Sequence, residues 1–274
     1  MQKQFFTRRY YFSNPKYINF NRFIIQHKMG TTTYLVVIIF LGSLVNSTFG
    51  FGFALTTVPL LSLFFGLNTL GPLIPLLFLT SGILIVFQGR KNVQFKSVIP
   101  LALAATLIIP IGVYLNKYGP EMIMKLILGI FIVIFSIYNL KTPVLPKLND
   151  NKTAPIFGGL SGLFAGICNI SGPPAVIYAA LRQWQPNIFR VTLQAYFLYV
   201  NCIVISSHVY IRSYDNPNIV LYYLIALPSM LLAIPIGKKI NQSIKSPQKF
   251  NKYVYGLMLF SGVLLIVKSI NTIL

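Results

Sequence analysis

Residues 155–184 read PIFGGLSGLFAGICNISGPPAVIYAALRQW, an apolar stretch interrupted by Asn169-Ile170-Ser171-Gly172-Pro173-Pro174. Proline removes a backbone donor and glycine loosens the backbone, so one straight helix is not expected across the interruption. At membrane depth, such a break survives only where protein or a watery cavity surrounds it. The stretch therefore predicts a broken or re-entrant helical hairpin with its tip inside a membrane protein.

The first half of the chain has a matching stretch, residues 31–66, which is interrupted by Gly50-Phe51-Gly52. At an offset of 120 residues, Gly52 aligns with Gly172. The tetrapeptide Ile-Pro-Ile-Gly at 109–112 recurs at 234–237. Such a duplication is typical of secondary transporters, in which two repeats are often inverted in the membrane. The alternative is chance similarity among helices rich in Leu, Ile and Gly.

The composition indicates a membrane protein throughout. Among 274 residues, 23 are Lys or Arg and three are Asp or Glu, so charged residues make up 9%, against about 25% in ordinary soluble domains. Apolar residues make up 55%, and the mean hydropathy is +0.70. These values exclude a soluble enzyme, a disordered chain and a disulfide scaffold. The sequence predicts an all-α polytopic membrane protein with the lipid bilayer as its partner.

The net charge of +20 does not indicate a nucleic-acid partner, because the basic residues are spread between apolar runs. With both interrupted stretches as hairpins, the loops at one end of the bundle hold 13 Lys or Arg and those at the other hold 4. This bias predicts that loops 89–96 and 238–252 are cytoplasmic and that the two repeats are oppositely oriented. A span needs about 20 apolar residues. The six predicted spans are 70–88, 97–116, 122–140, 191–210, 218–237 and 250–270.

The predicted organisation is a basic N-terminal extension (1–29), a first repeat (30–141), a linker (142–154) and a second repeat (155–274). Each repeat is a hairpin plus three transmembrane helices. The extension holds six basic and no acidic residues and lacks the apolar core of a secretory signal. Either Met29 is the functional start, or the extension breaks the charge rule, or the first stretch crosses the membrane once. A plasma-membrane location is expected, or an organellar membrane if the extension is a targeting segment.

Catalytic and metal-binding patterns are missing from the spans. The acidic residues are Glu121, Asp150 and Asp215, and all three fall in loops or at span edges. The sequence has no metal-spaced cluster of His and Cys and no phosphate-binding Gly-rich loop. We therefore expect no enzyme activity, no cofactor and no metal. A cation substrate is disfavoured as well, because a buried cation needs a matching carboxylate.

The two breaks offer what a small anion requires. A half-helix that begins at a break has free N–H groups and about half a positive charge at its N-terminus. Proline is tolerated in the first turn, so Pro173 or Pro174 is expected at the first helical position. The alternative is that both breaks are structural kinks. Gln194, Asn201 and His208 follow steps of seven residues, so they lie on one helix face, which is expected to point inward. The candidate substrate-binding residues are Thr48, Gly50, Gly52, Thr56 and Thr57 at the first break, Asn169, Ser171, Gly172 and Pro173 at the second, and Gln194 and Asn201 on this face.

The Gly50-Phe-Gly52 break, the Ser171-Gly-Pro-Pro174 break before an apolar helix, and Ile-Pro-Ile-Gly in each half resemble the TauE/SafE-like sulfite exporter family of membrane transporters. The resemblance covers about residues 30–271 and implies two inverted repeats, each a hairpin plus three spans. It also implies transport of a small sulfur-containing or organic anion, with the hairpin tips near the substrate. We expect a secondary exporter of a sulfur oxyanion or organosulfonate such as sulfite. The alternatives are a transporter of a non-sulfur organic anion and a membrane-embedded enzyme or assembly factor.

Overall fold

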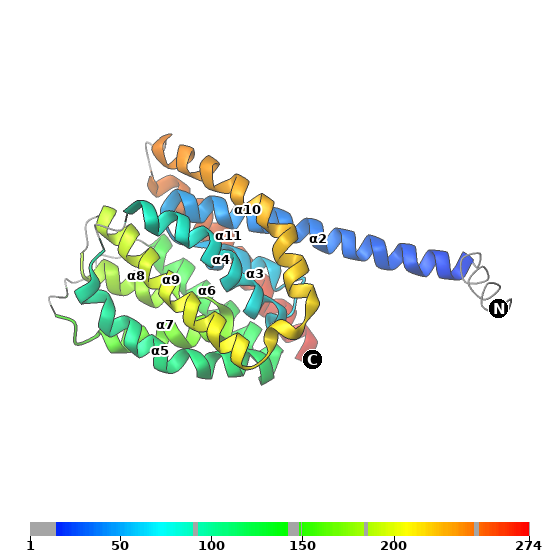
Figure 1. The fold of residues 1–274 in the computed structure, drawn as a ribbon, viewed down its shortest axis with the longest axis horizontal. Coiled ribbons are helices and arrows are strands. Elements are labelled where there is room, and N and C mark those ends of the chain that lie inside the picture. Colours follow the sequence, from blue (N-terminus) through cyan, green and yellow to red (C-terminus); the bar gives the residue numbers. More distant parts are fainter. Residues whose placement is uncertain are drawn as a thin grey trace.

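Helices make up every regular element in the part of the chain that the computed structural model describes, residues 15–89, 93–141, 148, 150–183, 186–243 and 247–273 (Figure 1). The all-α expectation is therefore confirmed. The first half contains α2 (Pro15–Phe49), α3 (Phe53–Leu61), α4 (Leu67–Gly89), α5 (Phe95–Tyr118) and α6 (Glu121–Leu140). The second half contains α7 (Ala154–Cys168), α8 (Gly172–Leu181), α9 (Pro186–Tyr210), the 3-10 turn η2 (Ser213–Asp215), α10 (Pro217–Ser243) and α11 (Pro247–Ile273).

All six predicted spans are helices, namely α4, α5, α6, α9, α10 and α11. Among the described residues, four segments are long and apolar enough to cross a membrane by length and composition: Gly30–Thr48, Val98–Tyr118, Glu121–Leu140 and Pro217–Ile240. Helix α9 is absent from these four, and it carries the polar residues Gln194, Asn201 and His208, which are buried. The predicted polar face of α9 therefore points into the protein, as expected.

The first interrupted stretch is a hairpin of antiparallel helices, α2 and α3. At its open end, the rings of Tyr34 and Phe64 stack with centroids 4.5 Å apart. Nearer the tip, a side chain at Gly42 would collide with Thr57 on the returning helix. The break occupies residues 50–52, which we call tip 1. The chain thus returns toward the end from which α2 entered the bundle, as the re-entrant interpretation predicts.

The second interrupted stretch folds in the same way from α7 and α8. The Phe157 and Tyr178 rings lie 5.9 Å apart across the pair, and at the open end the Leu148 N–H donates to the Leu181 carbonyl at 2.8 Å. The break, which we call tip 2, covers residues 169–171, and Gly172 is already the first residue of α8. The expectation that a proline occupies the first helical position was wrong, because Gly172 takes it and the two prolines follow in the first turn.

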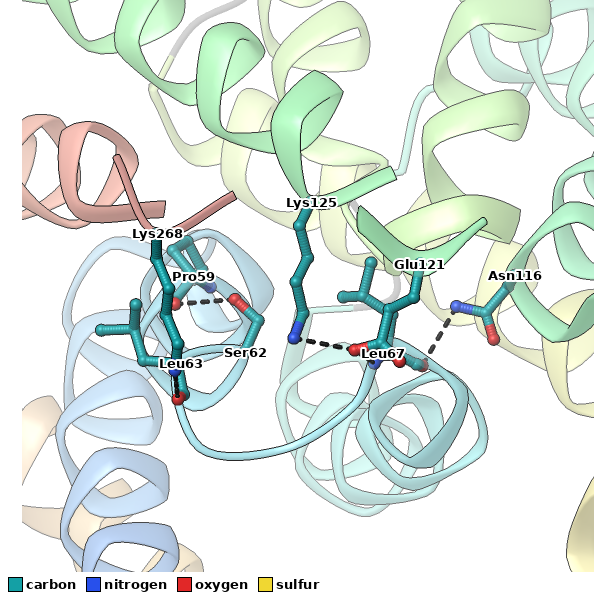
Figure 2. A network of polar contacts seen from close by, with 8 residues as sticks. All are labelled: Pro59, Ser62, Leu63, Leu67, Asn116, Glu121, Lys125 and Lys268. Atoms are coloured by element: carbon teal, nitrogen blue, oxygen red, sulfur yellow. Dashed lines mark hydrogen bonds and ion pairs between the residues drawn. The ribbon is translucent and has the colours of Figure 1, made fainter. Parts of the chain in front are cut away.

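The open end of the first hairpin is attached to α6 and α11 (Figure 2). Glu121 accepts a hydrogen bond from the Leu67 N–H at 3.4 Å and so satisfies a free donor at the start of α4. The same carboxylate pairs with Lys125 at 2.7 Å, and the Lys268 ammonium donates to the Leu63 carbonyl. The α3–α4 loop therefore lies beside the start of α6 and the end of α11.

The second hairpin opens at the other end of the bundle. Asn151, just before α7, donates to the Lys96 carbonyl at 3.4 Å near the start of α5. The Gln94 N–H donates to Thr192 Oγ1 at 3.1 Å near the start of α9. We call this end, with loops 93–96 and 150–153, the basic end, and the one with loops 62–66 and 211–216 the opposite end. The two hairpins therefore open at opposite ends of the bundle.

Each hairpin packs against a helix of the other half. In α7, a Cβ added at Gly162 would sit 2.6 Å from the Ala105 carbonyl oxygen of α5, and one added at Gly166 would sit 2.5 Å from that of Ile109. In α10, a side chain at Gly237 would collide with Ser47 of α2. Helices α4 and α9 pack together, as do α6 and α11. Glycines thus let backbones of the two halves touch, while the inverted repeat itself stays a prediction.

The structure describes only part of the predicted extension and linker. Helix α2 begins at Pro15 and runs without interruption through Met29, so residues 15–29 continue the first hairpin helix. Figure 1 shows this part of α2 projecting beyond the rest of the bundle at the opposite end. Most of the predicted linker 142–154 and residues 1–14 lie outside the described residues.

Candidate functional site

The two tips meet at one small cavity of about 30 Å³. The first turn of α3 and the residues of tip 2 face each other across it, since a Cβ added at Gly172 would sit 3.3 Å from Leu55 Cδ1. The middle parts of α4 and α9 complete the walls. The lining residues are Gly52, Phe53, Ala54, Leu55, Ile74, Phe78, Asn169, Ile170, Ser171, Gly172, Phe197 and Asn201. The predicted convergence of both breaks on one site is therefore present in the fold.

Tip 1 is built by two glycines in the left-handed region. Gly50 has φ 80° and Gly52 has φ 99°, conformations that side chains with a Cβ rarely adopt. Gly52 is the N-cap of α3 and accepts the first helical hydrogen bond, from the Thr56 N–H at 3.0 Å. The N–H groups of Phe53, Ala54 and Leu55 precede that bond and have no acceptor within the helix. All three residues line the cavity, so this helix N-terminus faces it.

Gln194 of α9 holds tip 1 in place. Its Nε2 donates to the Gly50 carbonyl and to Asn46 Oδ1, the latter at 3.1 Å. The side chain of Gln194 is fully buried and is not part of the cavity wall. Gln194 therefore positions tip 1 and does not line the cavity, and its predicted contact with substrate stays a prediction.

Tip 2 is held by the helix α4 of the first half. Asn169, with φ 59°, ends α7 in the left-handed conformation, which Asn tolerates better than most residues. Its Nδ2 donates to the Gly71 carbonyl at 3.1 Å and to that of Leu70 at 3.3 Å. Pro75 has no N–H to give to the Gly71 carbonyl four residues earlier. The proline in α4 thus frees the acceptor that Asn169 uses.

A chain of hydroxyl groups fixes the backbone beside Ser171. Tyr196 of α9 donates to Ser161 Oγ at 2.8 Å, and Ser161 donates to the Ser171 carbonyl at 2.7 Å. All three residues are buried. Because these contacts use the Ser171 carbonyl, the Ser171 hydroxyl is not needed for them. Ser171 itself lines the cavity at the N-cap of α8.

The cavity offers hydrogen-bond donors and partial charges without a full charge. None of the lining residues is ionisable. Helix α8 supplies fewer donors than α3, because Pro173 and Pro174 have no N–H, which leaves Gly172 and the hydroxyl of Ser171. Both helices direct their positive N-terminal ends toward the cavity. In the part of the chain that the structure describes, no group of three His, Cys, Asp or Glu residues could hold a metal ion.

Five of the predicted site residues line the cavity: Gly52, Asn169, Ser171, Gly172 and Asn201. The other six, Thr48, Gly50, Thr56, Thr57, Pro173 and Gln194, lie outside its wall. Thr48 donates to the Gly237 carbonyl at 3.2 Å across the α2–α10 contact, and Thr57 donates to the Phe53 carbonyl at 2.8 Å within α3. These two threonines serve packing and helix bonding.

The sequence prediction missed the apolar walls of the cavity. Ile74 and Phe78 of α4 and Phe197 of α9 line it, and the first two follow the four-residue step of one helix face. Helix α4 is apolar over most of its length, so no contrast in the sequence marks these positions. Phe53 and Leu55 were within reach of prediction, because they directly follow the break at Gly52.

Comparisons with known proteins identify the family of this chain. The family model described as sulfite exporter TauE/SafE matches residues 35–265. The probable membrane transporter protein MJ0441 of Methanocaldococcus jannaschii is 22% identical over 231 residues, which cover 77% of this chain and 86% of that protein. No solved structure matches the chain significantly. The chain is thus a multi-pass membrane protein of a transporter family, and it belongs to the TauE/SafE sulfite exporter family.

Proposed function

We propose that the protein is a secondary transporter that exports a small anion, a sulfur oxyanion or organosulfonate such as sulfite, across the plasma membrane. The observation that supports this most directly is the meeting of two half-helix N-termini at one cavity with no ionisable lining residue. Backbone N–H groups and helix dipoles there favour negative charge. A site that binds through partial charges can also release its anion, which transport requires.

The arrangement of the hairpins fits alternating access. The first hairpin opens at the opposite end and the second at the basic end, and each contributes its tip to the same cavity. In transporters built this way, one repeat moves against the other around a fixed site. We propose that the two hairpins form the two sides of this site, so that the cavity opens to one end at a time.

The apolar walls bear on the choice of anion. Phe53, Phe78 and Phe197 surround the donors of the two tips, so an anion with an apolar part would bury that part against the aromatic rings. This favours an organosulfonate over a bare oxyanion within the proposed class. It also gives physical support to the second candidate, transport of a non-sulfur organic anion.

Flux into proteoliposomes tests the proposal. The purified protein is reconstituted, and uptake of radiolabelled sulfite, thiosulfate, ethanesulfonate and a short carboxylate is measured under anion gradients. We expect saturable uptake that Gly172→Leu abolishes, because the new side chain would fill the cavity beside Leu55. Gly256→Leu is the matched control, since nothing lies within 4 Å of a Cβ there. If no anion moves under any gradient, the proposal fails in favour of a membrane-embedded enzyme or assembly factor.

A further inference from the structure

A second cluster of buried polar groups lies between the cavity and the opposite end of the bundle. It surrounds Gly71 of α4: a Cβ added there would collide with Asn116 Oδ1 and sit 3.0 Å from His208 Cε1. Asn116 is 2% exposed and His208 is 0% exposed. Asn116 Oδ1 and His208 Nε2 have no hydrogen-bond partner among the described residues. Two unpartnered polar atoms from α5 and α9 thus border one small space.

The orientation of both side chains follows from their other contacts. Asn116 Nδ2 donates to the Ile167 carbonyl at 2.7 Å and to the Leu67 carbonyl at 3.1 Å. Only the amide nitrogen can donate to two carbonyls, so the assignment of its oxygen to the open side is forced. His208 Nδ1 lies 3.0 Å from Ser213 Oγ. The ring therefore has one nitrogen on the loop residue Ser213 and the other without a partner.

The cluster is continuous with the cavity. Asn169, which lines the cavity, donates to the Gly71 carbonyl at 3.1 Å, and its own Oδ1 has no partner among the described residues. Asn201, another lining residue, precedes His208 by two turns on the same face of α9. Buried polar atoms without protein partners are where proteins hold water. The polar groups thus run from tip 2 to the loop at 211–216.

Histidine is the side chain whose unperturbed pKa lies nearest neutral pH, and His208 is the histidine of this cluster. Burial and the nearby Lys117 ammonium disfavour its imidazolium while the cavity is empty. The charged group that faces it is Lys117 of α5, whose ammonium donates to the Ile211 carbonyl. Tyr214 of η2 has its ring 6.4 Å from the imidazole. Burial raises the pKa of the Tyr214 phenol, so it stays neutral and donates to the Pro72 carbonyl at 3.1 Å. Among the described contacts of His208, no carboxylate is present to balance an imidazolium.

We propose that His208 is the proton-exchange site that couples proton movement to anion transport in this protein. The proposal rests on the proposed transport of an anion. Because Lys117 faces the ring and no carboxylate contacts it, the counter-charge for a protonated His208 is the anion in the cavity. Proton and anion binding then favour each other, and by linkage each raises the affinity for the other to the same extent.

One proton moves in each cycle. The neutral imidazole accepts a proton from a hydronium ion on the Ser213 side, which becomes water, and the ring is an imidazolium while an anion occupies the cavity. After the anion leaves, the ring returns that proton to water and is neutral again. Asn116 acts as a positioning residue, because its fixed amide oxygen faces the same space as the imidazole.

The test uses thiosulfate, the dianion of a strong acid, because it carries no titratable proton of its own near neutral pH. Binding to the purified full chain is measured by calorimetry at about pH 8 and about pH 5.5, so that the supply of protons differs between the two titrations. We expect binding to tighten about five-fold or more at the lower pH, within the usual range of such couplings. His208→Gln should bind with an affinity that does not change with pH.

Proteoliposomes supply the second measurement. Net uptake of thiosulfate down its gradient reports transport itself, and a trapped pH-sensitive dye reports the accompanying protons. His208→Gln should retain net uptake and lose the thiosulfate-dependent proton signal, and Ser213→Ala should slow that signal. Ser206→Ala is the matched control, because Ser206 lies on the exposed side of α9, bonded to the Cys202 carbonyl; it should change neither reading. Each variant is compared at matched melting temperature.

The outcomes separate the two proposals. A proton signal that accompanies net uptake in wild type and survives in His208→Gln overturns the role of His208 and leaves anion transport standing. Net uptake without any proton signal in wild type does the same. If His208→Gln does not fold, retention of the full proton signal and rate in Ser213→Ala overturns the proton route. Absence of binding and uptake for every anion tested refutes the transporter proposal and the proton site with it.

Discussion

Ser171→Ala is the sharpest test of the cavity as a binding site. Ser171 is the N-cap residue of α8 and lines the cavity, while its carbonyl carries the contact to Ser161. The substitution therefore removes one donor from the cavity and leaves the backbone contacts of tip 2 in place. Pro173 and Pro174 provide no N–H, so the hydroxyl is one of few donors that this side of the cavity presents.

The size of the effect follows from that small number of donors. A hydrogen bond to a charged acceptor contributes about 1.5–3 kcal/mol, and about 1.4 kcal/mol corresponds to a tenfold change in affinity. Loss of the Ser171 hydroxyl should therefore weaken anion binding by about tenfold to about a hundredfold. The melting temperature should remain near that of wild type, because the buried hydrogen-bond chain from Tyr196 to the Ser171 carbonyl is intact.

Calorimetric titration of the transported anion into purified wild type and variant measures this directly. Ser206→Ala, on the exposed side of α9, controls for the loss of a serine hydroxyl in general. Unchanged affinity in Ser171→Ala at equal melting temperature would mean that the Ser171 hydroxyl gives no hydrogen bond to the anion. The reasoning from the tips would then be refuted, and tip 2 would have a structural role alone.

Three further predictions concern the scaffold and its orientation. Gly162→Val should lower the free energy of unfolding by about 1–3 kcal/mol, because its Cβ would lie 2.6 Å from the Ala105 carbonyl oxygen. Gly159→Val should be nearly neutral, because the nearest atom, on Ile108, is 3.9 Å from a Cβ there. Equal melting temperatures of the two variants would contradict this. Gln194→Leu should cost about 1–3 kcal/mol by leaving buried acceptors at tip 1 unpaired, and an unchanged melting curve would show that other contacts hold the tip. In a cysteine-free background, an impermeant thiol reagent should label Tyr210→Cys but not Lys239→Cys in intact cells; the reverse pattern would contradict the predicted orientation.

The helices and breaks of this fold could be predicted from the sequence more fully than the contacts between them. Glycines at 50 and 52 mark tip 1 because their positive φ angles exclude most other residues. The start of α8 was misplaced because proline is accepted at more than one position of a first helical turn. Gln194 was recognised as an inward polar residue, but its partner, the Gly50 carbonyl, lies 144 residues away in sequence. Contacts over such separations depend on how whole helices pack, which local patterns do not specify.

The exchange of packing partners between the halves has a consequence for how the chain is made. Ser47 and Thr48 of α2 bond to the carbonyls of Ala233 and Gly237 in α10, 186 and 189 residues later. The first hairpin therefore enters the bilayer long before the ribosome has synthesised α10, the helix against which it packs. Until α10 is synthesised, the small-residue face of α2 can contact only lipid or the insertion machinery. The packing of the first hairpin against α10 is then among the last steps of folding, and a chain that stops short of α10 lacks the acceptors in α10 for Ser47 and Thr48.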